Sequence, residues 1–359
     1  MNKPIDSAVE IRKGEELDKQ KLLAFLKSNI SGFTDEIEIK QFPGGFSNLT
    51  YLISAPGALE KEYVLRKPPF GANIKSAHDM SREYKVLSLL EPVYTKIPKP
   101  IIFCEDEAVI GSPFYLMERV KGIILRNKIP KELNLTPNHF KKLSIHTIEN
   151  LVDIHNLELE KSNLISIGRP DGYVERQVEG WIKRYFKAET DEIKSMNFAA
   201  EWMASNIPSK GTVSFIHNDY KYDNLVLDVD SLEIKAVLDW EMATVGDPLM
   251  DLGTTLAYWV EKEDNAILHQ FNVTWAEGNL TRQQVIEKYA ELSNIDIEDV
   301  LFYYVFGCFK LGVIAQQIYA RYKKGYTKDE RFAMLIHLVR ACGQNAENAI
   351  KYKRINNFY

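Results

Sequence analysis

Short runs in which apolar and polar residues alternate dominate the first third of the chain, and such alternation predicts strands with one buried face. The clearest example is residues 36–40, where Ile37 and Ile39 alternate with charged residues. We predict strands at 36–40, 49–53, 62–66, 101–104 and 114–117, and helices at 15–30 and 76–90. Because turn residues separate several of these runs, the pattern indicates a small, mostly antiparallel sheet with one helix inserted.

Apolar residues recur every three or four positions beyond residue 121, and this spacing predicts helices. Helices are predicted at 143–157, 181–188, 198–206, 281–293, 299–322 and 332–349, with short strands at 213–216, 225–227 and 236–238. We therefore expect an α+β protein with two domains. A β-rich domain would cover residues 1–118 and a larger, mainly helical domain residues 119–359. This order of domains resembles the bilobal architecture of protein kinases.

The composition is that of a globular chain with a substantial core, since 45% of its 359 residues are hydrophobic and 26% are charged. The formal net charge is −5 and no block of basic residues stands out, so no nucleic-acid partner is expected. Three widely spaced cysteines exclude a disulfide framework and a cysteine-rich zinc site. No leader segment is expected, because the N-terminal residues contain no apolar run. No membrane span is expected either, because the most apolar run, 301–315, is interrupted by Lys310 and too short to cross a bilayer. We expect a cytoplasmic protein.

The strongest chemical signal is a group of polar residues set between short apolar runs in residues 215–241. His217, Asp219 and Asn224 follow one predicted strand, and Asp239 ends another, 20 positions after Asp219. Phosphoryl transfer needs a carboxylate that accepts the proton of the attacking hydroxyl and oxygen ligands for Mg²⁺, and this set supplies both. One such residue alone would indicate a turn with a capping carboxylate, but the complete set at this spacing favours catalysis.

The β-rich domain carries residues suited to a nucleotide. Gly44 and Gly45 lie in a turn between two predicted strands, where the absence of a Cβ lets the backbone approach phosphates. A glycine pair can also serve simply to reverse the chain. Arg66 ends the next predicted strand, at the position of the phosphate-binding cation of kinases. Glu83 on the following helix is its expected partner or else a solvated residue, and Lys67 would point to the opposite face.

Three stretches resemble one known family, and they are HNDYKYDNLVLD from His217, VLDWEMATVGDPLMDLG from Val237 and GGFSNLTYLI from Gly44. Together they are similar to the aminoglycoside phosphotransferase and choline-kinase-like family, and most of all to the phosphotransferase domains linked to acyl-CoA dehydrogenases. The resemblance covers about residues 35–330. It implies a bilobal protein-kinase-like fold, ATP and Mg²⁺ as cofactors, and transfer of the ATP γ-phosphate to the hydroxyl of a small molecule.

The resemblance also implies roles for individual residues. Asp219 would be the catalytic base, with Asn224 and Asp239 as magnesium ligands. Lys221 would neutralise the transferring phosphate, at a position where relatives often carry Arg or His. His217 would orient the catalytic loop through hydrogen bonds. The residues implied to contact the nucleotide are Gly44, Gly45, Ser47, Asn48, Arg66, Glu83 and Glu118, the last of them in the hinge between the lobes.

Four further residues lie close to these motifs or are expected to pack beneath them. Asp247 follows a glycine and precedes a proline, which suits the cap of a helix. We expect Asp247, Asp251 and His155 to support the catalytic loop rather than to bind ligands. Asp223 fits a turn residue as well as a metal or substrate contact.

The sequence leaves the acceptor open. Residues 261–300 carry nine acidic side chains against three basic ones, which fits an acidic cleft for an amino sugar or choline-like acceptor, or an ordinary solvated surface. Aromatic residues over 302–322 fit either a core or an apolar site for a hydroxyacyl compound. A nucleotide-binding pseudokinase that acts as a binding module is the alternative function. Such proteins usually lack one of Asp219, Asn224 and Asp239, all of which are present here.

Overall fold

The computed structural model describes residues 6–33, 35–43, 48–55, 61–69, 79–327 and 329–358. The chain divides into two compact units. The first comprises Met1–Ile123 together with Val226–Glu241, and the second comprises Ile124–Leu225 together with Met242–Tyr359. The segment Val226–Glu241 therefore belongs to the first unit, whereas the predicted boundary at residue 118 assigns it to the helical domain.

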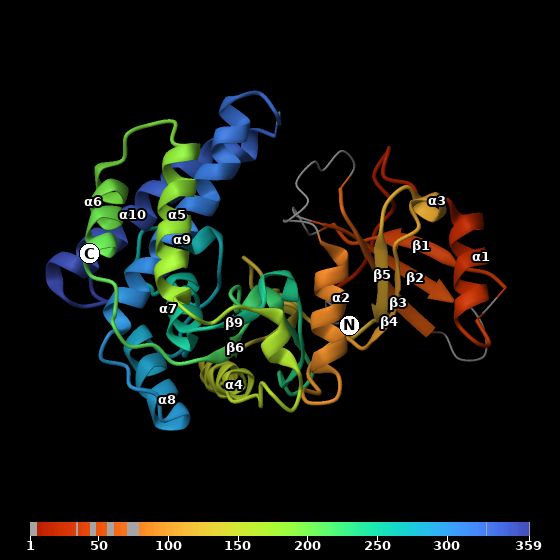
Figure 1. Cartoon of the computed structure of the whole chain (residues 1–359), viewed down its shortest axis with the longest axis horizontal. Helices are drawn as coiled ribbons and strands as arrows, with labels where there is room; N and C mark the ends of the chain where they lie inside the picture. Colours follow the sequence, from red (N-terminus) through yellow and green to blue (C-terminus); the bar gives the residue numbers. More distant parts are fainter. Residues whose placement is uncertain are drawn as a thin grey trace. The chain divides into compact units, whose positions relative to one another are not determined.

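The first unit is built on a five-stranded antiparallel sheet with the strand order β1-β2-β3-β5-β4. Its strands are β1 (Glu38–Gln41), β2 (Leu49–Ala55), β3 (Lys61–Lys67), β4 (Pro100–Cys104) and β5 (Phe114–Glu118). Helix α1 (Lys19–Asn29) covers one face of the sheet and helix α2 (Met80–Leu90) covers the other (Figure 1). The short helix α3 (Glu107–Ile110) lies between β4 and β5 in the chain. The five strands and two helices predicted for this region are confirmed.

Alternation along β3 separates the hydrophobic core from the polar site. Leu65 of β3 joins a buried cluster with Leu22 and Leu26 of α1. Its neighbour Arg66 pairs in register with Tyr115 of β5. Because successive side chains of a strand point to opposite faces, Arg66 lies on the face that α2 covers.

Residues 226–241 belong to the first unit because they are hydrogen-bonded to it. Strands β7 (Leu225–Leu227) and β8 (Ile234–Val237) form a two-stranded sheet. Ile123 and Leu227 exchange backbone hydrogen bonds of 2.9 and 2.8 Å, and the Val237 N–H donates to the Lys96 carbonyl at 2.8 Å. This segment is therefore held on both sides by residues that precede position 124.

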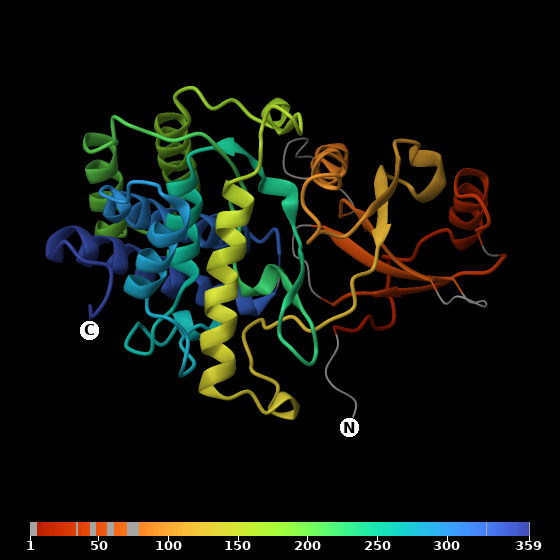
Figure 2. The same ribbon diagram turned by 90° about the horizontal axis from the view of Figure 1, so that it is seen from below.

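The second unit is mainly helical, and α9 is its central helix. Its helices are α4 (Pro137–His155), α5 (Tyr173–Ala188), α6 (Lys194–Ser205), α7 (Pro248–Tyr258), α8 (Arg282–Ser293), α9 (Val300–Lys323) and α10 (Leu335–Tyr352). Helix α9 contacts α5, α6, α7 and α10, while α4, yellow in Figure 2, packs against α8. Where α7 meets α9, a Cβ on Gly253 or on Gly307 would lie 2.1 Å from a carbonyl oxygen of the other helix. These glycines allow the close approach. The short strands β6 (Ser214–Ile216) and β9 (Thr244–Gly246) pair antiparallel.

Among the described residues, α9 is the one helix whose length and hydropathy match those of a membrane span. However, 72% of its most apolar window is buried inside the protein. The apolar run at 301–315 thus belongs to a helix long enough to cross a bilayer, which differs from the expectation. Its burial is typical of the central helix of a globular core.

Several elements escaped or only partly followed the pattern, and α4 and α5 begin at Pro137 and Tyr173, before the predicted 143 and 181. The periodicity does not predict β9 or α3, which have three and four residues. Such short elements contain too few positions to show a period. The start of α7 is predicted by its cap, and Asp247 indeed accepts a hydrogen bond from the Leu249 N–H at 2.8 Å.

Candidate active site

Residues 217–224 form a loop between β6 and β7 that carries Asp219. The backbone is left-handed near the start of the loop, where Asn218 has a φ of 67°. Few residues other than glycine and asparagine adopt this region. The N–H groups of His217 and Asn218 donate to the carboxylate of Asp251 on α7, at 2.6 and 2.8 Å. The loop ends in a 3₁₀ turn at Tyr222–Asn224.

Asp251 is fully buried, and His155 fixes its position. His155 Nε2 lies 3.2 Å from Asp251 Oδ2, and its Nδ1 lies 2.8 Å from the hydroxyl of Tyr289 on α8. Burial alone would raise the pKa of Asp251, but His155 and the loop N–H groups lower it, so Asp251 is a carboxylate. The expected support of loop 217–224 by Asp251 and His155 is confirmed, and the catalytic role of that loop stays a prediction.

Three of the predicted site residues meet at the carboxylate of Asp219. Lys221 Nζ lies 3.0 and 2.9 Å from its two oxygens, and Asn224 Nδ2 donates to Oδ2 at 2.9 Å. A fourth group, the hydroxyl of Tyr258 at the end of α7, donates to Oδ1 at 2.8 Å. Asp219 is therefore surrounded by donors that fix the direction of both carboxylate oxygens.

Lys221 and Tyr258 also contact each other. Lys221 Nζ lies 4.5 Å from the centroid of the Tyr258 ring, which is a cation–π geometry. Burial would lower the pKa of Lys221, but the adjacent Tyr258 and Asp219 raise it above its usual value. Lys221 therefore remains a cation beside the candidate base. Its contact with a transferring phosphate stays a prediction.

Asp223 lies next to this cluster. Burial raises its pKa to about 6, and Lys221 opposes that shift. Its Oδ1 atom is buried and has no hydrogen-bond partner among the residues that the structure describes. Buried carboxylate oxygens are normally hydrogen-bonded, so this oxygen is unusual. A ligand contact for Asp223 stays a prediction.

The orientation of Asn224 suits a magnesium ligand. Its Nδ2 group donates to the backbone oxygen of Asp219 at 2.8 Å and to Oδ2 at 2.9 Å. The amide oxygen is thereby turned away from Asp219, and Mg²⁺ prefers such hard oxygen donors. Within the described ranges, no group of three or more His, Cys, Asp and Glu residues forms a metal cage.

In the first unit, Arg66 is the centre of a buried ion-pair network. Its NH1 group lies 2.5 Å from Glu83 Oε1 on α2, and its NH2 group lies 2.8 Å from Asp239 Oδ1. Glu241 Oε2 lies 3.8 Å from the same NH2 group and accepts a hydrogen bond from Asn48 Nδ2 at 2.7 Å. The expected pairing of Arg66 with Glu83 is confirmed, and the structure brings Asn48 and Asp239 to the same network.

This network holds more carboxylate than guanidinium charge. Burial raises the pKa of Glu83 above its usual value, and Arg66 opposes that shift only in part. For Arg66, burial lowers the pKa, but the neighbouring carboxylates outweigh this effect and raise it above its usual value. Arg66 Nε is buried and lacks a hydrogen-bond partner among the described residues. Asp239 is held with a φ of 67°, in the left-handed region. A divalent cation would offset the excess of negative charge, and Asp239 offers it a carboxylate oxygen, so the donor set fits the Mg²⁺ that the sequence implies.

The remaining predicted nucleotide contacts have the following surroundings. Lys67 lies on the opposite face of β3 from Arg66, and its Nζ donates to the Ile110 carbonyl at 3.2 Å. Glu118 ends β5 with an exposed side chain, and its N–H donates to the Lys99 carbonyl at 2.8 Å. Gly44, Gly45 and Ser47 lie outside the described residues. The nucleotide contacts of these residues and of Glu118 stay predictions.

The acidic residues between 261 and 300 do not form one site. Arg282 is buried, forms an ion pair with Asp264 and donates its backbone N–H to Glu261 Oε1 at 2.7 Å. Its guanidinium also donates to the carbonyls of Trp259 at 3.0 Å and Ile355 at 2.7 Å. The other acidic side chains are exposed, and they are Glu263, Glu277, Glu287, Glu291, Asp296, Glu298 and Asp299. The structure therefore favours a solvated surface over an acidic acceptor cleft.

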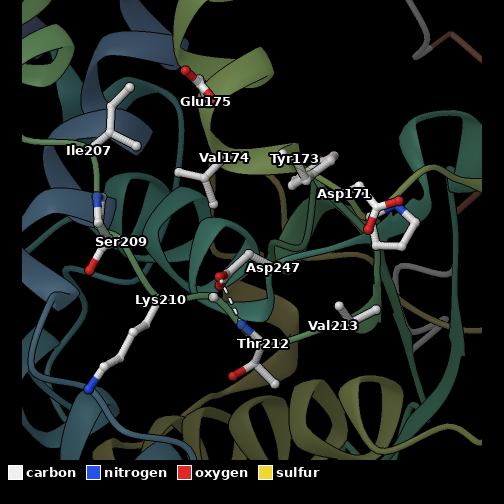
Figure 3. Close-up of a pocket in the computed structure, with 14 residues that line it drawn as sticks. Asp171, Tyr173, Val174, Glu175, Ile207, Ser209, Lys210, Thr212, Val213 and Asp247 are labelled. Atoms are coloured by element: carbon white, nitrogen blue, oxygen red, sulfur yellow. Dashed lines mark hydrogen bonds between the residues drawn. The ribbon is translucent and has the colours of Figure 1, made fainter.

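A pocket of about 430 Å³ lies elsewhere in the second unit (Figure 3). Residues 170–175, residues 207–213 and Asp247 line it, and none of them was predicted to bind nucleotide, metal or acceptor. Asp247 accepts a hydrogen bond from the Thr212 N–H at 3.3 Å, drawn as a dashed line in Figure 3. Tyr173 connects the pocket wall to loop 217–224, because its hydroxyl accepts a hydrogen bond from Asn218 Nδ2 at 3.0 Å.

Two members of these clusters were not predicted from the sequence. Glu241 follows Asp239 by two positions, and its place in the same motif was the available signal. Tyr258 lies 39 positions from Asp219, and no motif marks it.

The chain is similar in sequence and fold to several known proteins. Residues 38–292 match the phosphotransferase enzyme family, APH. Human acyl-CoA dehydrogenase family member 11 is 32% identical over 338 residues, which cover 92% of this chain and 43% of that protein. A solved Ralstonia eutropha structure assigned to the aminoglycoside phosphotransferases is 27% identical, with a TM-score of 0.75 over 92% of this chain and 99% of that one. Choline kinase from Cryptosporidium parvum, at 14% identity, shares the fold with a TM-score of 0.57 over 92% and 100% of the two chains.

The fold is therefore that of the kinase-like phosphotransferases, as the motifs implied. The chain belongs to the phosphotransferase enzyme family, because the family match covers more than half of its length. It spans less than half of the human acyl-CoA dehydrogenase family member that it matches. The roles of individual site residues and the identity of the acceptor stay predictions.

Proposed function

We propose that this chain is an ATP- and Mg²⁺-dependent O-phosphotransferase that moves the γ-phosphate of ATP to the hydroxyl group of a small molecule. The observation that supports this most directly is the carboxylate of Asp219, held by Asn224 and Lys221 on a loop anchored to Asp251. Asp219 would accept the proton of the attacking hydroxyl. Lys221 would stabilise the negative charge that develops on the transferred group.

The nucleotide side of the proposal rests on the network around Arg66. Arg66, fixed by Glu83, would contact the phosphates of ATP, and Asn224 and Asp239 would hold the magnesium ion. When bound, that ion would offset the charge of the phosphates. The further nucleotide contacts in the proposal are Gly44, Gly45, Ser47, Asn48 and the backbone of Glu118.

A hydroxyacyl compound is the first acceptor class to test, because this chain matches part of an acyl-CoA dehydrogenase family member. Amino sugars and choline-like compounds are the second and third classes, as the names of the structural relatives suggest. Most acidic residues in 261–300 are exposed, so they do not form a buried anionic site for a cationic acceptor. Hydroxyacyl compounds therefore come first.

The test measures ATP consumption with Mg²⁺ and each acceptor class, for the wild type and for Asp219→Asn. Turnover that depends on both an acceptor and Asp219, with a phosphorylated product seen by mass spectrometry, would support the proposal. ATP binding without turnover on any acceptor of the panel would instead support a nucleotide-binding pseudokinase.

A further inference from the structure

Lys310 is a charged residue in the apolar centre of the second unit. It lies on α9, it is 2% exposed, and most of its neighbours along the helix are apolar. Its ammonium donates to the backbone oxygen of Asn218 at 2.7 Å, and it lies 3.5 Å from Thr254 Oγ1 and 5.8 Å from the centroid of the Trp181 ring. Moving an ammonium out of water is unfavourable, and Met or Leu would fill this space without that cost. Packing alone therefore does not explain a lysine here.

The oxygen that Lys310 contacts belongs to the peptide group joining Asn218 to Asp219. The N–H of Asn218, on the other side of the same residue, donates to Asp251 at 2.8 Å. The Asn218 side chain donates to the Met242 carbonyl at 3.1 Å. Asn218 has a φ of 67°, in the left-handed region that asparagine adopts more readily than other side-chain-bearing residues. The N–H of the Asn218–Asp219 peptide donates to His217 Nδ1 at 3.2 Å, and Lys310 binds its oxygen, so both polar groups of the peptide immediately before the candidate base are held.

The charged groups that face Lys310 come from three elements. They are Asp219 and Lys221 of the loop, Asp251 of α7 and Arg184 of α5. Burial lowers the pKa of Lys310 to about 8, with the two carboxylates opposing this shift and the two cations adding to it. At neutral pH the side chain is therefore mostly an ammonium, and charge-assisted hydrogen bonds are stronger than neutral ones.

We infer that Lys310 is a positioning residue for Asp219: from the core of the helical unit, it fixes the Asn218–Asp219 peptide and thereby the direction of the carboxylate. The restraint of the loop is independent of any activity. The consequence for catalysis rests on the proposed function.

The first test measures hydrogen exchange by mass spectrometry and needs no substrate. Lys310→Met removes the donor and keeps a similar side-chain length, and Val313→Ala, one turn further on the same buried helix, is the matched control. We expect amides of residues 217–221 to exchange at least tenfold faster in Lys310→Met, relative to peptides of α10, but not in Val313→Ala. Equal effects of the two variants on this peptide would overturn the inference. If Lys310→Met cannot be purified, Lys310→Gln takes its place in the same comparison.

The second test uses the acceptor identified for the wild-type protein. Lys310→Met should lower kcat at least tenfold while the KM for ATP changes less than twofold, and Lys310→Arg, which keeps a charged donor, should recover part of the loss. Val313→Ala should lower the melting temperature without a comparable loss of kcat. A wild-type kcat in Lys310→Met would remove the catalytic consequence, whereas a wild-type protein inactive on every acceptor would count against the proposed function and leave the exchange result standing.

Discussion

Arg66 and Asp239, which are 173 positions apart in the sequence, form a 2.8 Å ion pair within the first unit. The residue expected to contact the phosphates of ATP is thus bonded to a residue expected to bind their metal ion. Glu83 holds the other arm of the guanidinium at 2.5 Å, so Arg66 has a fixed position from which it can orient Asp239. Changes at these residues should therefore affect nucleotide binding and stability in distinguishable ways.

Asp239→Asn should abolish the Mg²⁺-dependent part of ATP binding and leave weak, metal-independent binding. The reason is that an uncharged amide is a poorer ligand for Mg²⁺ than a carboxylate. Isothermal titration calorimetry with and without Mg²⁺ measures the difference. Asp230→Asn, which changes an exposed carboxylate nine positions earlier, should bind like the wild type. Unchanged Mg²⁺-ATP affinity in Asp239→Asn would remove Asp239 from the metal site.

Arg66→Met should lower the free energy of unfolding by about 3–5 kcal/mol, because it leaves a buried carboxylate without its partner. The carboxylate is Glu83, which is 1% exposed. The variant with both Arg66→Met and Glu83→Gln should be destabilised by less than the sum of the two single variants. Urea unfolding of the four proteins gives this coupling, and additive losses would contradict a coupled pair.

Asp219→Asn should reduce kcat by about 10²–10⁴, the usual cost of losing a general base. Affinity for ATP should be unchanged, which calorimetry can measure. Tyr258→Phe is the matched control, because it removes a hydrogen bond to Asp219 Oδ1 but keeps the carboxylate and the ring beside Lys221. We expect a loss of less than tenfold in that variant. Near-normal turnover of Asp219→Asn would show that another group takes the proton.

Lys310 should make stability rise with pH between about 8 and about 10.4. Burial lowers the pKa of Lys310 to about 8 in the folded protein, whereas an unfolded lysine titrates near 10.4. In that window the unfolded chain binds one more proton than the folded chain, so the free energy of unfolding increases with pH. The wild type should therefore gain on the order of 2–3 kcal/mol relative to Lys310→Met across the window. Urea unfolding at a series of pH values measures this gain, and a constant difference would disprove it.

Arg282→Met should destabilise the second unit by about 3–5 kcal/mol, because Asp264 and Glu261 lose the cation that neutralises them. The buried guanidinium also satisfies the Trp259 and Ile355 carbonyls. Arg321→Met, which changes an exposed arginine of α9, is the control and should be nearly neutral. Thermal unfolding that is the same for both variants would show that the Arg282 network contributes nothing.

Local spacing explains what was predictable in the site. Asp219, Lys221 and Asn224 lie within six consecutive positions, so any tight loop brings them together. Tyr258 reaches Asp219 from 39 positions away and Lys310 reaches Asn218 from 92 positions away, and no spacing rule connects them. In the sequence Lys310 was visible only as an interruption of an apolar run. A single cation within an otherwise apolar helical run indicates that it has a polar partner in the core. That signal could have identified Lys310 as a residue of interest.

The count of acidic residues in 261–300 did not predict their ion pairs, because these pairs depend on tertiary contacts. The acidic excess in 261–300 gave no sign that Arg282 binds Glu261 and Asp264 within the fold. Helical periodicity, by contrast, predicted the helix itself and left its aromatic residues open between a core and an apolar acceptor site. Most of them are buried, and the buried ones are Phe302, Tyr303, Tyr304, Phe306, Phe309 and Tyr319. Periodicity reports burial, whereas the partners of a buried charge follow from the packing of whole helices.

Because Val226–Glu241 belongs to the first unit, neither unit is a continuous stretch of chain. A fragment that ends at Ile123 would lack Asp239, and Arg66 would lose one of its carboxylate partners. A chimaera that exchanges only residues 1–123 with those of a relative would combine Arg66 of one protein with the segment 226–241 of the other. Exchange of the first unit between relatives therefore requires that both stretches be transplanted together.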